Sequence, residues 1–200
     1  MQIGILGLAG AGKDTAAEII SRITGLPIHR YADPLKVAAL KVFGRNFDKR
    51  DVKEVQVPFY GRKIEDRAIE AAMDLCRDLG FQGAKADEFQ ELFFEVMCLP
   101  MMSPRQFQQL LGTDVCRTVD EDCFIKALPK VAVIPDVRFE NELAYDLNIL
   151  INRDVPSVNT HKSEAFAKEV LNDPTFYDDI IIVDNNGSIK DLETSLKGLL

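Results

Sequence analysis

The chain has few of the residues that hold a structural zinc ion. Among its 200 residues there are only two histidines, and its four cysteines form no Cys-x-x-Cys pair. Structural zinc sites need closely spaced ligands, so we expect none here. The cysteines are scattered through sequence with a helical pattern, which favours reduced thiols in a cytoplasmic protein over a disulfide framework.

An excess of positive charge is also missing. The chain has 24 Lys and Arg against 32 Asp and Glu, which gives a formal net charge of −8 at pH 7. Proteins that bind nucleic acid polymers or membrane surfaces present a broad positive field, and this composition does not supply one. An anionic ligand must therefore be held by a local basic pocket, and we expect a small-molecule partner.

Long apolar runs are absent as well. The stretch from Ile3 to Ala11 is short, contains glycine and is followed by Lys13, so we expect neither a signal peptide nor a membrane span. With 46% hydrophobic and 28% charged residues, the composition is that of an ordinary globular protein.

Short apolar runs alternate with helical patterns along the chain. Four runs are typical of strands buried on both faces, and a weaker fifth follows the first helix: Ile3–Leu6, Val131–Ile134, Asn148–Ile151, Ile180–Val183 and Pro27–Ala32. Helices are expected at Lys13–Ile23, Pro34–Phe43, Ile64–Leu79, Asp87–Cys98, from Ser103 to a stop at Gly112, and after a Ser188 cap. This order predicts an α/β fold with a five-stranded parallel sheet.

One region breaks the alternation. Residues 45–100 contain no convincing strand and begin with a charged segment, 45–53, that resembles an exposed connection. We expect a mostly helical insertion here, within a single domain that spans residues 1–200.

A glycine-rich segment stands directly between the first strand and the first helix. Gly7, Gly10 and Gly12 allow a sharp turn whose backbone N–H groups face inward, at a helix N-terminus that favours anions. Lys13 follows in the spacing G-x-x-x-x-G-K, which places an ammonium on the β- and γ-phosphates of a nucleotide. The segment predicts a polyphosphate site, and the alternative is a glycine-rich turn with a solvated lysine.

The residue after the lysine departs from the usual pattern. Ser or Thr normally stands there and its hydroxyl ligates Mg²⁺, whereas this chain has Asp14. A carboxylate aimed at phosphates would be repelled, so we expect Asp14 to face outward or to meet Mg²⁺ through water. Thr15 is then the hydroxyl left for the phosphates.

Charged residues also follow two other predicted strands, at the edge where ligands of open α/β sheets bind. Asp33 either caps a helix or orients the attacking phosphate and accepts its proton, and the two roles are compatible. Asp136 suits Mg²⁺ held through water, and the guanidinium of Arg138 suits phosphate oxygens. The alternative for Arg138 is a surface ion pair with Glu140 and Glu142.

The helix expected after Ser103 carries Arg105 and Gln109 four residues apart, on one face. A cation and an amide together suit a nucleotide phosphate and a base edge. A solvated polar face explains the same pattern equally well.

Taken together, these segments resemble the deoxynucleoside monophosphate kinases found mostly in bacteriophages. These are P-loop proteins related in architecture to adenylate and guanylate kinases. The resemblance keeps its order over most of the chain, is weakest over residues 45–100, and rests on five segments: GLAGAGKDT (Gly7–Thr15), YADPLK (Tyr31–Lys36), SPRQFQQLLGTDVCR (Ser103–Arg117), DVRFENE (Asp136–Glu142) and HKSE (His161–Glu164). A Lys-x-Thr order after the loop, as in Lys13 to Thr15, is also the pattern of nucleoside monophosphate kinases.

The resemblance implies a three-layer P-loop NTPase fold and transfer of the γ-phosphoryl group of ATP to a deoxynucleoside monophosphate, with Mg²⁺. The cytoplasm, that of the host for a phage protein, is the implied location. The ATP phosphates would be bound by Gly10, Ala11, Gly12, Lys13, Asp14 and Thr15. The acceptor would be lined by Asp33, Lys36, Arg105, Gln109, Gly112, Thr113, Asp136, Arg138 and Glu142. The implied catalytic residues are Lys13, Asp33 and Arg138, and the implied magnesium residues are Asp14, Thr15 and Asp136.

The resemblance leaves several points open. Gln106 stands where related proteins tend to have a second basic residue, and no role follows for His161, Ser163 or Glu164. The bases accepted, the choice between deoxy and ribo acceptors, and a homodimer stay open. Two other functions compete: a P-loop kinase for another small acceptor, such as dephospho-coenzyme A or a sugar acid, and a module that binds nucleotide without catalysis.

Overall fold

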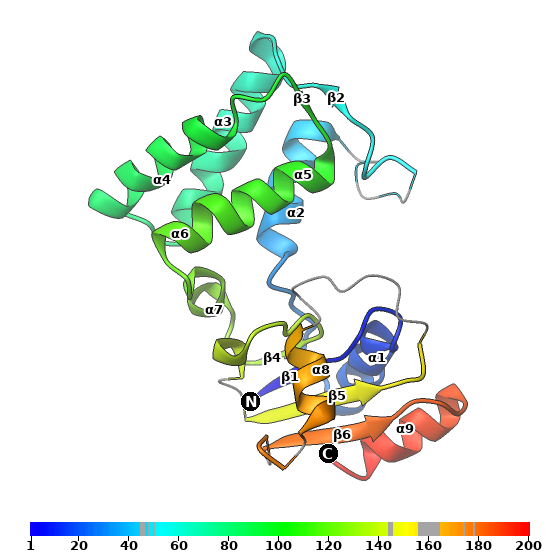
Figure 1. Ribbon diagram of the computed structural model, residues 1–200. Helices are drawn as coiled ribbons and strands as arrows, with labels where there is room; N and C mark the ends of the chain where they lie inside the picture. Colours follow the sequence, from blue (N-terminus) through cyan, green and yellow to red (C-terminus); the bar gives the residue numbers. More distant parts are fainter. Residues whose placement is uncertain are drawn as a thin grey trace. The chain divides into compact units, whose positions relative to one another are not determined.

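The chain forms two compact units. The computed structural model describes residues 1–44, 47, 49, 51–143, 146–155, 165–173, 175–177 and 179–200. The sheet unit comprises Met1–Tyr31 and Leu128–Leu200, and the helical unit comprises Ala32–Ala127 (Figure 1). The helical unit therefore extends further in both directions than the insertion at residues 45–100 expected from the sequence.

The sheet unit contains four parallel strands in the order β4-β1-β5-β6. They are β1 (Gln2–Leu6), β4 (Ala132–Ile134), β5 (Leu147–Asn152) and β6 (Ile180–Asp184). All four coincide with the apolar runs, so the predicted α/β class and these strands are confirmed. The fifth strand is not confirmed, because the segment at 27–32 contributes only one parallel bridge, Ile28 to Val133, along the outer side of β4.

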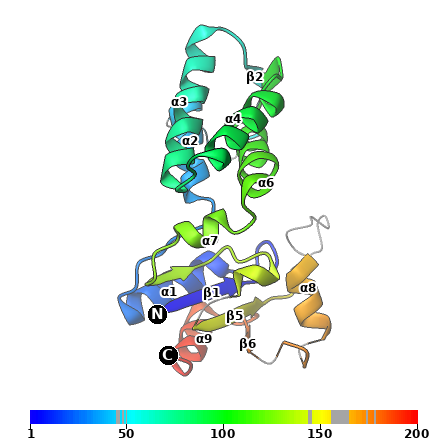
Figure 2. The same ribbon diagram turned by 90° about the vertical axis from the view of Figure 1, so that its left-hand side faces the viewer.

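Helices cover both faces of the sheet. α1 (Lys13–Thr24) and α9 (Ile189–Lys197) lie on one face, and α8 (Ala165–Asn172) lies on the other (Figures 1 and 2). Apolar side chains of α1 and α9, such as Ile20 and Leu196, are buried with the inner strand residues Ile3, Ile5 and Ile149 in one core cluster. Burial of these side chains supplies most of the stabilisation of the unit.

Two helix ends in the sheet unit follow the sequence signals. α1 ends at Gly25, which takes a left-handed conformation with φ of 75°. The predicted Ser188 cap of α9 is confirmed, because its Oγ accepts the N–H of Asp191 while the Asp191 carboxylate accepts the N–H of Ser188. No helix among the described residues is both long and apolar enough to cross a membrane.

The helical unit is built from six α-helices, a π-helix and a short strand pair in its described residues. These are α2 (Asp33–Phe43), β2 (Val57–Pro58), α3 (Arg62–Asp78), α4 (Ala84–Val96), β3 (Met101–Met102), α5 (Pro104–Gln109), η1 (Leu110–Cys116), α6 (Arg117–Val119) and α7 (Cys123–Ala127). The predicted absence of strands at 45–100 is wrong at β2, which pairs antiparallel with β3. Two residues are too few for the period-2 pattern to reveal a strand.

An aromatic cluster forms part of the core of this unit. Phe43 of α2 contacts Phe59 and Phe107, with ring centroids 6.1 and 5.6 Å away. The segment 45–53, expected to be exposed, is only partly described, and its Phe47 is buried. The apolar side chain of Phe47 explains this difference, since burial in the core outweighs the charge of its neighbours.

The helix expected to stop at Gly112 does not stop there. α5 continues without a break into the π-helix η1 and then into α6. Gly112 is not among the glycines with positive φ, and a Cβ added to it would lie 2.6 Å from Leu35 Cδ1. The glycine therefore allows close approach of α2 to the π-helix rather than ending a helix.

Candidate functional site

The glycine loop, residues 7–12, lies at the carboxyl edge of the sheet. It leaves β1, a central strand, and leads into α1. The chain crosses from β1 to the Ile28 bridge beyond β4 on one side, whereas β5 and β6 lie on the other side. The loop thus stands where the strand order reverses, the position at which open α/β sheets bind ligands.

Three positions of the loop have backbone conformations that favour glycine. Gly7, Gly10 and Gly12 have φ of 145°, 80° and 98°. A Cβ on Gly7 would lie 2.5 Å from the carbonyl oxygen of Ile151 in β5, which is too close for any side chain. The loop is thereby set directly against the sheet edge, with a turn closed by the Ala11 N–H on the Leu8 carbonyl at 3.1 Å.

Lys13 folds back over this loop. Its Nζ donates to the carbonyls of Gly7 at 2.8 Å and Leu8 at 2.9 Å, and the side chain is half-buried. The ammonium is therefore held by neutral oxygens at the loop, where a phosphate oxygen, which carries charge, forms a stronger hydrogen bond.

The loop is held from the far edge of the sheet by Asn185, which the sequence analysis missed. Its Nδ2 donates to the carbonyl of Ala11 at 2.7 Å, and the residue is only 8% exposed. The available signal was its position directly after β6, since residues at the carboxyl ends of parallel strands meet at one edge.

Asp14 faces away from the loop, as one of the two expectations held. Its Oδ1 accepts from Arg30 Nη2 at 2.8 Å, and its side chain is 74% exposed. Sequence reasoning missed Arg30, although it stands two residues past Ile28 at the same edge of the sheet. Thr15 is half-buried in the first turn of α1.

Asp136 and Arg138 follow β4 at this edge. Asp136 is half-buried, and its Oδ1 accepts the N–H of Tyr31 at 3.1 Å. The exposed side chain of Arg138 forms no ion pair within the described residues, so the surface pairing with Glu140 and Glu142 is not present there. Glu142 is 1% exposed, and its Oε2 accepts the N–H groups of Arg138 and Phe139 at 2.6 and 3.3 Å. It thus fixes the backbone that carries Arg138.

The other predicted acceptor residues all lie in the helical unit. Asp33 is the first residue of α2 and Ala32 holds the cap position, so the predicted N-cap at Asp33 is wrong by one residue. Lys36 is half-buried in the same helix, and its N–H donates to the Ala32 carbonyl. Since Pro34 fixes φ and has no N–H, it suits the first turn that follows.

The predicted site residues on and after α5 differ in exposure and in their partners. Arg105 Nη1 bonds Glu54 Oε1 at 2.9 Å, and Gln109 is exposed. Gly112 is buried against Leu35, and the carbonyl of Thr113 accepts from Thr118. His161, Ser163 and Glu164 lie outside the described residues.

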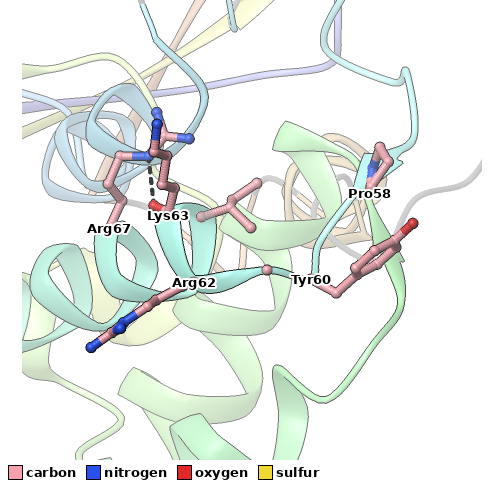
Figure 3. Close-up of a pocket in the computed structure, with 7 residues that line it drawn as sticks. Pro58, Tyr60, Arg62, Lys63 and Arg67 are labelled. Atoms are coloured by element: carbon pink, nitrogen blue, oxygen red, sulfur yellow. Dashed lines mark hydrogen bonds between the residues drawn. The ribbon is translucent and has the colours of Figure 1, made fainter.

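Two open hollows lie elsewhere in the part of the chain that the structure describes, and neither contains a predicted site residue. One, of about 380 Å³, lies in the helical unit between Pro58 and Tyr60 on one side and Arg62, Lys63 and Arg67 of α3 on the other (Figure 3). All five of these side chains are exposed. The other, of about 480 Å³, adjoins α8 in the sheet unit and is lined by Ala165, Lys168, Glu169, Asn172, Asp173, Phe176 and Tyr177.

The cysteines do not extend the candidate site. Cys76, Cys116 and Cys123 are buried in the helical unit, and all four thiols are free. Burial raises the pKa of the Cys123 thiol to about 11 and raises the pKa of Cys76 and Cys116 as well. A thiol with a raised pKa is a poor nucleophile at neutral pH, so these groups serve the core.

The chemistry supported within the sheet unit is therefore anion binding: a glycine loop, one ammonium and a helix N-terminus at the reversal of strand order. Neither a protein-family model nor a curated protein sequence matches this chain.

Proposed function

We propose that the protein is a P-loop phosphotransferase that moves the γ-phosphoryl group of ATP to a deoxynucleoside monophosphate. The observation that carries the proposal is the glycine loop between β1 and α1, with the Lys13 ammonium folded over it. The finer fold assignment, a three-layer P-loop NTPase with a fifth strand at the Ile28 bridge, belongs to the same proposal.

The loop fits a triphosphate through its donors. Among the described residues, the N–H groups of Gly10 and Gly12 have no acceptor, while the N–H of Ala11 is used by the turn. The first N–H groups of α1 add the positive end of a helix dipole. On phosphate binding, the Lys13 ammonium would exchange two carbonyl oxygens for phosphate oxygens, and this exchange replaces neutral acceptors by charged ones.

The residues near the loop also fit a magnesium ion that arrives with the nucleotide. Thr15, in the first turn of α1, and Asp136, directly after β4, are the proposed oxygen ligands, and Asp14 would join them after its pair with Arg30 opens. When bound, the ion neutralises charge that develops on the β- and γ-phosphate oxygens.

Arg138 is proposed to contact the transferring phosphoryl group. Its guanidinium is exposed and has no acidic partner among the described residues, while Glu142 holds its backbone N–H. A planar guanidinium binds two phosphate oxygens at once, which suits the charge that spreads over the phosphoryl group in transfer.

The acceptor nucleotide is assigned to residues of the helical unit. Support comes from the placement of Asp33 and Lys36 on α2, and of Arg105 and Gln109 on α5. In this proposal Asp33 orients the attacking phosphate of the acceptor and accepts its proton.

The test is a coupled assay of ADP release with ATP, Mg²⁺ and each of the four deoxy- and four ribonucleoside monophosphates. We expect turnover with at least one deoxynucleotide, and a Lys13→Met variant that is slower by at least about a thousandfold because it lacks the ammonium at the phosphates. Each tenfold loss of rate corresponds to about 1.4 kcal/mol of transition-state stabilisation. Lys190→Met, which removes an exposed lysine from α9, is the matched control and should keep the parental rate.

Other outcomes identify the competing functions. Turnover with dephospho-coenzyme A or a sugar acid, and with none of the eight nucleotides, would reassign the acceptor. Tight ATP binding without ADP release in the presence of every acceptor would make the protein a binding module. Near-parental turnover by Lys13→Met would remove the loop from the mechanism altogether.

A further inference from the structure

Asn185 makes a contact that bears on how the loop presents its donors. It is 8% exposed at the end of β6, and its own N–H donates to the Asn152 carbonyl at the end of β5, at 2.7 Å. Its Nδ2 donates to the Ala11 carbonyl, also at 2.7 Å. The side chain is thus anchored to the sheet through its backbone and reaches the loop through its amide.

That bond fixes a whole peptide plane. The chain has no cis peptide bonds among its described residues, and in a trans peptide the C=O of one residue and the N–H of the next point in opposite directions. Because the Ala11 carbonyl points to Asn185, the Gly12 N–H points away from Asn185. Within the described residues this N–H has no acceptor, so it is presented as a donor.

The peptide needs such a restraint because glycine follows it. Gly12 has φ of 98°, and glycine populates both signs of φ readily, so the Ala11–Gly12 peptide would otherwise rotate at small cost. A Cβ on Gly12 would lie 2.5 Å from Nδ2, so Asn185 would have to move away from the loop to admit one. Gly12 and Asn185 are therefore in close contact although 173 positions separate them in the sequence.

We infer that Asn185 is a positioning residue that orients the Gly12 N–H of the loop toward the polyphosphate group of the nucleotide. The inference rests on the proposed function, since it assigns the oriented donor to a phosphate oxygen. A donor fixed before binding costs no ordering entropy on binding, so its loss appears as weaker affinity for the phosphates.

The test compares three variants in the full-length protein. Asn185→Ala removes the donor, and Asn185→Asp keeps the shape but sets a carboxylate against the Ala11 carbonyl. Asn152→Ala is the matched control: it removes the bond from Asn152 Nδ2 to Asp184 Oδ1 at 2.7 Å, between the ends of the same two strands, and leaves the Asn152 carbonyl in place. Calorimetric titration with ATP plus Mg²⁺ and with inorganic tripolyphosphate gives the affinities.

We expect Asn185→Ala to weaken both ligands about tenfold, the size of one hydrogen bond to a charged group. Asn185→Asp should weaken them further, and Asn152→Ala should stay within about twofold of the parent. Equal losses for ATP and tripolyphosphate show that the effect lies at the phosphates. In the free protein, the amide resonance of Gly12 should move in both Asn185 variants, because the hydrogen bond to the carbonyl of the same peptide is lost, and it should stay unchanged in Asn152→Ala.

Two results would overturn the inference. Parental affinity in Asn185→Ala, with the parent binding both ligands, would remove Asn185 from phosphate binding and leave the proposed function standing. Absence of binding by the parent would overturn both. Circular dichroism confirms that each variant is folded at the titration temperature, and if Asn185→Ala fails this check, Asn185→Asp carries the same comparison.

Discussion

Among single residues, Gly7 has both a positive φ and a close backbone contact, and a comparison with Gly25 separates the cost of the two. Gly7→Ala should destabilise the protein through its positive φ and through contact with the Ile151 carbonyl, at 2.5 Å from the new Cβ. Gly25→Ala is the control, since Gly25 also has positive φ but no atom within 4 Å of its added Cβ. Backbone strain costs about 1–3 kcal/mol and a core overlap adds about 1–3 kcal/mol.

Urea unfolding of both variants checks this prediction. The free energy of unfolding should fall further for Gly7→Ala than for Gly25→Ala by at least about 1 kcal/mol. Equal losses would mean that the loop moves away from β5 without cost.

Residue-scale features also mark the limit of sequence reasoning. Lys13 and the three glycines were identified because the loop is continuous in sequence. Asn185 and Arg30 were not, because their partners are 174 and 16 positions away and are reached only through the strand order. Glu142 was assigned to the lining of the acceptor site, whereas in the structure its carboxylate accepts the backbone N–H groups of residues 138 and 139.

At the scale of elements, one carboxylate in the segment before α7 forms ion pairs with two helices, α4 and α7. Asp120, 12% exposed at its side chain, accepts from Lys85 of α4 and Lys126 of α7 at 2.6 and 2.7 Å. These two lysines hold the pKa of Asp120 at about 2, below its usual value near 3.8. Because the folded pKa is lowered, the stabilisation is present above about pH 4 and is lost as the pH falls through about 2.

Asp120→Asn should therefore lower the free energy of unfolding by about 1 kcal/mol near neutral pH, a modest value because both lysines are half-exposed or more. The difference from the parent should shrink between about pH 5 and pH 2. Denaturant titrations at several pH values measure it, with Asp51→Asn, at an exposed turn, as control. A difference that stays constant over this range would show that Asp120 contributes packing rather than charge.

Elements were largely predictable where a periodic pattern is long. The four strands and the helices α1, α3 and α9 follow their apolar spacing closely. The π-helix did not follow from sequence, because a glycine at a helix end and a glycine that admits Leu35 of another helix carry the same local signal. Only the tertiary contact distinguishes them.

For the whole molecule, the proposed function assigns ATP to the sheet unit and the acceptor to the helical unit. ATP alone should slow amide hydrogen exchange in the sheet unit, around residues 7–15, and leave the helical unit unchanged. At an ATP concentration of about 100 Kd the linkage reaches about 2.7 kcal/mol. Added deoxynucleoside monophosphate should then slow exchange in α5 and η1.

Exchange measured by mass spectrometry in four states, free, with ATP, with acceptor, and with both, tests this prediction. Lys13→Met is the control and should lose the ATP effect while it keeps the exchange pattern of the free protein. Equal protection of both units by ATP alone would contradict the separate assignment of donor and acceptor.

The bond between Asp136 and Tyr31 carries a thermodynamic consequence. Tyr31 is the last residue of the sheet unit before the chain enters α2, and its N–H is held by the carboxylate proposed for magnesium. A cation that bound Oδ1 of this carboxylate would compete with the Tyr31 N–H for that oxygen, and each interaction would then weaken the other. By reciprocity, loss of the Tyr31 hydrogen bond would raise the affinity for the cation by the same factor by which the cation weakens that bond.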